Sequence, residues 1–87
     1  MLDKPDVVYK VYPNPMTTFS IIQGPEEPLE TIFLQLMDAN GKLVAEYNMA
    51  SERLQIDFEN TLTPGTYFLT FYTREGQFIQ QNKLIKQ

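Results

Sequence analysis

The chain has 87 residues, 43% of them hydrophobic and 21% charged, which is typical of one small globular domain and not of a disordered segment. It contains no cysteine and no histidine, which excludes disulfides, thiolate chemistry and the usual general base at neutral pH. The net charge of −4, without a basic stripe or an apolar run of about 20 residues, argues against nucleic-acid binding and against a membrane-spanning helix.

Charge is distributed unevenly along the chain. Residues 26–59 carry eight acidic and two basic side chains, whereas residues 60–87 carry one acidic and three basic side chains. The polar residues 1–6 are interpreted as the end of a linker, and residues 7–87 as the domain. The basic side chains of the domain are therefore concentrated toward its last segment.

Seven short runs of β-forming residues, separated by proline, glycine and asparagine turn signals, follow one another along the chain. Several alternate apolar and polar residues with the period of two that is typical of half-buried strands. Residues 43–53 also have helix-forming composition, but a strand followed by a loop fits the flanking pattern better. The predicted strands span residues 7–12, 17–22, 31–37, 42–47, 54–58, 66–73 and 78–86.

The alternation also predicts which side chains share a face of each strand. Short strands with regular turns predict an all-β fold, an Ig-like antiparallel β-sandwich of about seven strands. The predicted faces comprise Phe19 and Ile21; Ile32, Leu34 and Leu36; Leu54, Ile56 and Phe58; and Tyr67, Leu69 and Phe71.

The first turn signal is the sequence Tyr12-Pro13-Asn14-Pro15. Neither proline can donate a hydrogen bond to a strand ladder, and Pro13 is expected to end the first strand. On its own, the sequence is a strand terminator.

The second turn signal is Asp38-Ala39-Asn40-Gly41. It is similar to the opening of a calcium loop, but the following Lys42 and apolar residues supply none of the further oxygen ligands that such a loop needs. Asn-Gly between two apolar runs instead predicts a hairpin, with the Asp38 carboxylate bonding back to the turn amides.

The third turn signal is Leu62-Thr63-Pro64-Gly65-Thr66-Tyr67. The leucine is expected to be buried, Pro-Gly to form the turn, and the Tyr67 hydroxyl to bond back to the backbone of the corner. This arrangement resembles the tyrosine corner of immunoglobulin-type sandwiches, which stabilises the fold and is not a binding site.

Catalytic and cofactor sites are not predicted. The adjacent carboxylates Glu26 and Glu27, and Asp57 with Glu59, have no predicted pocket to separate their pKa values, and neither serine has a histidine partner. We therefore expect no enzyme activity, no metal, no cofactor and no small-molecule substrate. Core and strand packing is the default interpretation of the aromatic side chains Tyr9, Tyr12, Tyr47, Phe68 and Tyr72, and a carbohydrate platform is the alternative.

The order of these motifs over residues 9–87 resembles the C-terminal sorting domain of type IX secretion cargo, of the type that begins with Tyr-Pro-Asn-Pro. The family motifs fall on residues that we expect to be mainly structural. They are Tyr12, Pro13, Asn14 and Pro15; Asp38, Asn40, Gly41 and Lys42; and Leu62, Pro64, Gly65 and Tyr67.

The resemblance implies a non-catalytic secretion signal that carries its cargo from the periplasm through the outer-membrane translocon. It implies a shuttle protein and a surface sortase as further partners, with cleavage of the signal and attachment of the cargo at the outer-membrane surface or release outside the cell. A receptor would add a strand to the edge of the last strand. We expect recognition at the basic and apolar residues Lys83, Leu84, Ile85 and Lys86.

Two other interpretations stay open from the residues alone. The first is an accessory Ig-like module that binds carbohydrate or spaces the domains of a secreted enzyme. The second concerns assembly, since an open terminal strand also allows a weak homodimer.

Overall fold

A computed structural model describes residues 9–15, 18–24, 31–57 and 62–87. The predicted linker 1–6, the predicted strand positions 7, 8, 17 and 58, and the carboxylates Glu26, Glu27 and Glu59 lie outside these ranges. Within these ranges the chain forms strands and no helix, and it therefore has no helix there that could cross a membrane. The strands are β1 (Lys10–Tyr12), β2 (Phe19–Gln23), β3 (Ile32–Asp38), β4 (Leu43–Met49), β5 (Arg53–Asp57), β6 (Gly65–Tyr72) and β7 (Phe78–Lys86).

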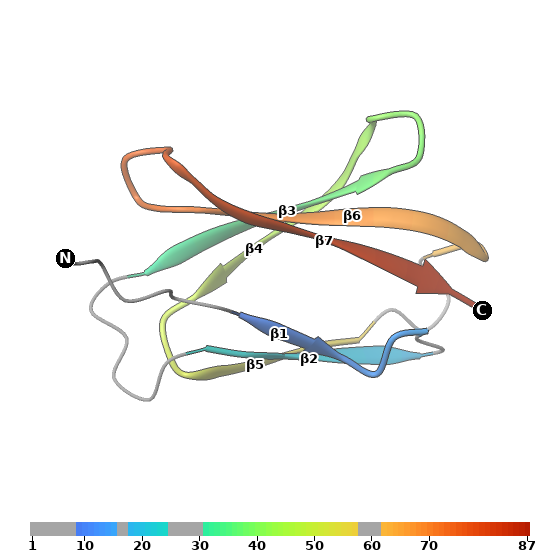
Figure 1. Cartoon of the computed structure of the whole chain (residues 1–87), viewed down its shortest axis with the longest axis horizontal. Coiled ribbons are helices and arrows are strands. Elements are labelled where there is room, and N and C mark those ends of the chain that lie inside the picture. The colour runs from blue at the N-terminus through green and yellow to red at the C-terminus, as the bar shows by residue number, and fades with distance from the viewer. Residues whose placement is uncertain (1–8, 16–17, 25–30, 58–61) are drawn as a thin grey trace, which may run out of the picture.

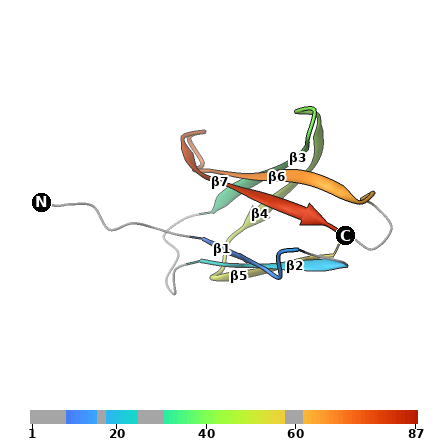
Figure 2. The same cartoon turned by 45° about the vertical axis from the view of Figure 1, so that its right-hand side comes forward.

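The strands form two facing antiparallel sheets, one with the order β1-β2-β5 and one with the order β4-β3-β6-β7 (Figure 1). This confirms the predicted all-β sandwich. Residues 43–49 are a strand, as predicted in preference to a helix. The turn ends of the β3–β4 and β6–β7 hairpins curve away from the three-stranded sheet, and β7 runs above β1 in both views (Figures 1 and 2).

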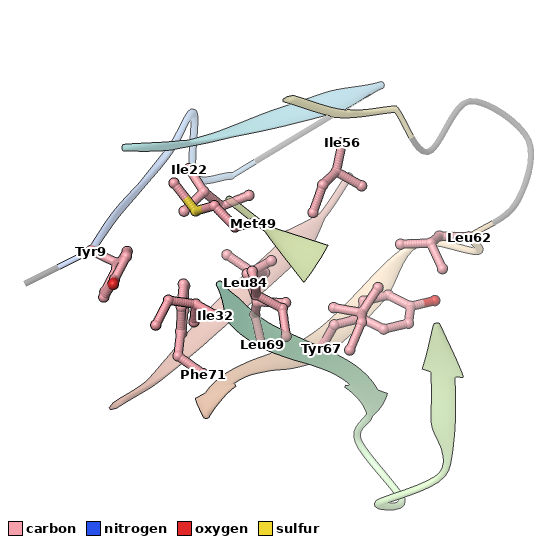
Figure 3. Close-up of a cluster of buried hydrophobic side chains, with 12 residues drawn as sticks. Tyr9, Ile22, Ile32, Met49, Ile56, Leu62, Tyr67, Leu69, Phe71 and Leu84 are labelled. Atoms are coloured by element: carbon pink, nitrogen blue, oxygen red, sulfur yellow. The ribbon is translucent and has the colours of Figure 1, made fainter. Parts of the chain in front are cut away.

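The core fills the space between the sheets, and β3 and β6 supply half of its side chains (Figure 3). The predicted faces of β3 and β6 are confirmed, since all six of their side chains are buried. Full burial of one such side chain stabilises the fold by roughly 1.5–3 kcal/mol. The core side chains are Tyr9, Ile22, Ile32, Leu34, Leu36, Met49, Ile56, Leu62, Tyr67, Leu69, Phe71 and Leu84.

Strand β2 turns a different face to the core from the one that its larger side chains suggest. Phe19 and Ile21 share a face, but they are only partly buried, whereas Ser20 and Ile22 are 1% and 0% exposed. The register explains this, because Ser20 and Ile22 stand opposite Ile56 and Leu54 of β5. Pairing with β5 thus selects the inward face of β2.

Tyr9, just before β1, is part of the core. Its ring stacks on Phe71, with 5.0 Å between the ring centroids and an angle of 26° between the planes. Gly24 lies against the same ring, since a Cβ atom at that position would come within 2.8 Å of Tyr9 Cε2. The start of the domain is therefore held by close packing of an aromatic ring.

The β3–β4 turn has the predicted hairpin geometry. Asp38 Oδ1 accepts hydrogen bonds from the backbone N–H groups of Asn40 and Lys42, both at 2.9 Å. Gly41 adopts φ = 85°, a left-handed conformation that glycine takes without steric cost. These bonds satisfy the turn amides, so the aspartate acts as a turn-forming residue.

The predicted tyrosine corner is also present. The Tyr67 hydroxyl donates a hydrogen bond of 2.7 Å to the carbonyl oxygen of Thr63, across the bend that contains Pro64. The ring itself is buried, as is Leu62. The corner thus fixes the start of β6 on the core.

Candidate functional site

The four residues expected to carry recognition lie at the end of β7, which is an edge strand of the four-stranded sheet. Their side chains alternate between the two faces of that sheet. Leu84 is 1% exposed and belongs to the core, whereas Lys83 is exposed and Ile85 is 40% exposed. Lys86 is half-buried. Lys83 and Ile85 therefore present the accessible side chains, and Leu84 anchors them.

Asn14 lies against this part of β7, although it is about 70 residues away in the sequence. Its Nδ2 donates a hydrogen bond of 2.9 Å to the carbonyl oxygen of Lys83, and its Oδ1 accepts one of 3.1 Å from the backbone N–H of Ile85. Leu84, between them, pairs with Tyr67 of β6. In an antiparallel strand, successive residues direct their backbone groups to opposite sides. Asn14 thus occupies backbone groups that point away from β6, on the open edge.

Gln80 makes a second link between the two ends of the domain. The Tyr9 backbone N–H donates to Gln80 Oε1 at 2.8 Å, and Gln80 Nε2 donates to the Tyr9 carbonyl oxygen at 2.9 Å. The same Nε2 also contacts Oδ1 of Asn82. One side-chain amide therefore pairs with the backbone of Tyr9 as a peptide group of a neighbouring strand would.

The family motifs converge on one end of the sandwich. Asp38 stands opposite Tyr67 in the β3–β6 register, and Tyr67 stands opposite Leu84 in the β6–β7 register. Gly65 stands opposite Lys86. With Asn14 beside Lys83 and Ile85, the first and third motifs therefore lie next to the last strand, and Asp38 of the second motif lies one strand further across the sheet.

The other members of the motifs have structural positions. Strand β1 ends at Tyr12, as predicted. Tyr12, Pro13 and Pro15 are exposed, and the Tyr12–Pro13 and Asn14–Pro15 peptide bonds are cis. The exposed Asn40, Gly41 and Lys42 belong to the β3–β4 turn, and Pro64 belongs to the corner before β6.

Gln80 and Asn82 were not among the predicted site residues. The signal that pointed to them is their spacing, because residues 80, 82 and 84 share a face of β7 and Leu84 faces the core. A polar side chain that is turned toward the core is expected to have a hydrogen-bond partner. No buried side-chain nitrogen or oxygen in the described residues lacks one.

The five aromatic residues considered as a carbohydrate platform do not form a row. Tyr9 is 5% exposed and stacks in the core, which contradicts its place in such a platform. Tyr47 pairs with Leu34, on the face of the sheet opposite to the one that carries Phe68 and Tyr72. Burial raises the pKa of the Tyr47 hydroxyl above 10.0.

A shallow, open hollow of about 530 Å³ lies on the four-stranded sheet. Phe33 and Tyr72 contribute apolar surface to it, while Gln35 and Glu46 are joined across it by a hydrogen bond of 3.3 Å. None of the four residues Lys83–Lys86 lines this hollow. In the described part of the chain, no three acidic side chains come close enough together to bind a metal ion.

Comparison with known proteins identifies the family. A sequence model of the secretion system C-terminal sorting domain matches residues 10–87, which include all seven strands and all three motifs. No curated protein matches the chain. The match covers most of the chain and agrees with the two-sheet fold that brings the motifs together. The chain therefore belongs to the secretion system C-terminal sorting domain family and is a sorting signal for type IX secretion.

Proposed function

We propose that the secretion machinery recognises this domain through the end of β7, with Lys83 and Ile85 as the contact residues and Leu84 as their anchor. The observation that carries the proposal is the alternation at this edge strand, where an exposed basic and an exposed apolar side chain flank a buried leucine. Lys83 and Lys86 also carry positive charge in a chain whose net charge is −4. A receptor with an acidic and apolar surface would be attracted to this segment.

The finer route of export belongs to the same proposal. The domain passes through the periplasm with its cargo, binds a shuttle protein and the outer-membrane translocon, and is then cleaved by a surface sortase. The cargo remains at the cell surface or is released outside the cell. In this role the domain is a non-catalytic signal that acts through binding alone.

The test is an export assay in a host that has the type IX pathway. The 87-residue chain is fused after a reporter that carries a Sec signal, and the reporter is measured outside the cell. Deletion of residues 83–87 removes a core side chain together with the surface, so it cannot separate folding from recognition. A double surface variant, Lys83→Glu with Ile85→Thr, changes the accessible side chains and leaves Leu84 in place.

The chain offers a control in Arg53→Glu with Gln55→Thr, on β5. This variant makes the same charge reversal two residues from a second surface change, and both side chains are exposed and lie outside the family motifs. We expect the Lys83/Ile85 variant to lower export at least fivefold and the control to leave it within twofold. Equal export of both variants would exclude recognition at the end of β7 and would assign it to another surface of the domain.

A further inference from the structure

The open edge of β7 is covered by a side chain that resembles a peptide group. The Asn14 carboxamide donates to Lys83 O and accepts from Ile85 N–H at the same time. Those are the donor and acceptor roles that a backbone peptide group has in a sheet. The chemistry of this contact therefore identifies the Lys83–Ile85 edge as a surface for pairing with an extended strand.

The segment from Tyr9 to Pro15, which carries Asn14, is held more firmly at its Tyr9 end than at its Asn14 end. Tyr9 is buried, stacked on Phe71 and joined to Gln80 by two hydrogen bonds. Asn14 is exposed, as are Pro13 and Pro15 on either side of it. The segment can therefore leave the β7 edge at its Asn14 end while its Tyr9 end stays packed.

The two prolines limit how well residues 13–15 can cover the edge. A proline has no backbone N–H, so neither can donate to the carbonyl groups of β7. Only the Asn14 side chain bonds to β7 in this segment, and it holds one carbonyl and one N–H. An incoming strand would replace these two bonds and could add further main-chain bonds along the same edge.

We propose that the Asn14 side chain covers the Lys83–Ile85 edge of β7 reversibly. An extended strand of the secretion machinery then pairs with this edge by displacing the Asn14 side chain. This inference rests on the proposed function, and it adds the binding mode and its regulation. While Asn14 is bound, the apparent affinity for the partner strand is reduced by the fraction of molecules with an open edge.

The first measurement is hydrogen exchange of the Ile85 backbone amide in the 87-residue chain. Asn14→Ala removes its acceptor, and we expect exchange at Ile85 about tenfold faster. Leu84 serves as the internal reference, because its backbone pairs with β6. Asn48→Ala is the matched variant, since Asn48 is an exposed asparagine on β4, at the opposite edge of the same sheet from β7. Unchanged exchange at Ile85 in the Asn14 variant would overturn the proposal.

The second measurement is competition for export. The untethered 87-residue chain with a Sec signal is produced at graded levels beside the exported reporter fusion, and the level that halves export is determined. We expect the Asn14→Ala chain to halve export at a level several-fold lower than the unaltered chain, and the Asn48→Ala chain to match the unaltered one. Equal or weaker competition by the Asn14 variant, with faster exchange at Ile85, would show that the cover does not regulate recognition.

Two controls separate this inference from the proposed function and from self-association. If the Lys83/Ile85 surface variant competes as well as the unaltered chain, the proposed recognition site is wrong, whatever Asn14 does. Sedimentation velocity of the Asn14→Ala chain gives its oligomeric state. A monomer supports a strand of the machinery as the partner, whereas a dimer would assign the edge to a second copy of this chain and overturn the proposal.

Discussion

Leu84 and Ile85 are neighbours in β7, yet substitutions at these positions are expected to have different consequences. Leu84 is 1% exposed, and truncation to alanine would leave a cavity in the core. Such truncations cost about 2–5 kcal/mol. A domain of 87 residues has a free energy of unfolding of roughly 4–13 kcal/mol, so Leu84→Ala removes a large part of it. We expect the melting temperature to fall by at least about 10 °C.

Ile85 is 40% exposed, and Ile85→Thr keeps the β-branched shape that strands favour. Its cost should be below about 1 kcal/mol, with a change in melting temperature of a few degrees. Thermal and urea denaturation of the 87-residue chain, followed by circular dichroism, measure both effects. A loss below 0.5 kcal/mol for Leu84→Ala (about a quarter of the lower bound), or above about 2 kcal/mol for Ile85→Thr, would refute the assignment of anchor and contact residue.

Three further predictions concern the packing and the turns. Tyr67→Phe removes the hydroxyl that donates to Thr63 O but keeps the buried ring, and urea denaturation should show a loss of about 1 kcal/mol; no loss would contradict a stabilising corner bond. Gly24→Ala forces the Tyr9 ring to move, and we expect a loss of about 1–3 kcal/mol in the same assay together with a change in the near-ultraviolet signal of the aromatic rings. Burial raises the pKa of the Tyr47 hydroxyl above 10.0, so this group ionises first in the unfolded chain. The free energy of unfolding therefore decreases as pH rises from about 10 through the pKa of the folded state. Tyr47→Phe should show a smaller decrease over that range in urea denaturation, and equal slopes for the two chains would contradict the shift.

Local patterns were sufficient where a strand has one apolar and one polar face, or where a turn is held by residues close in sequence. The alternation of Ile32, Leu34 and Leu36 predicts the core side of β3, because only one face is continuously apolar. The Asp38 turn and the Tyr67 corner involve partners at most four residues apart, so the motif contains the whole interaction.

Patterns fail where the deciding partner is distant. In β2 both faces are partly apolar, and only the pairing of Ser20 and Ile22 with β5 selects the inward one. The contact of Asn14 with Ile85 spans 71 residues and depends on two sheet edges lying side by side. The sequence motif therefore identified Asn14 as a motif residue, but only the fold shows that it bonds to the backbone of Ile85.

The links of Tyr9 to Gln80 and of Asn14 to Ile85 have a consequence for the order of folding. Each joins residues 71 positions apart, so a chain made from its amino end must hold Tyr9 and Asn14 without these partners until residues 80 and 85 have been added. Contacts of such high sequence separation form slowly, since loop closure precedes any gain from the contact. The domain consequently cannot close its β1–β7 side until residue 85 has been added, and this side is expected to be the last part of the sandwich to become ordered.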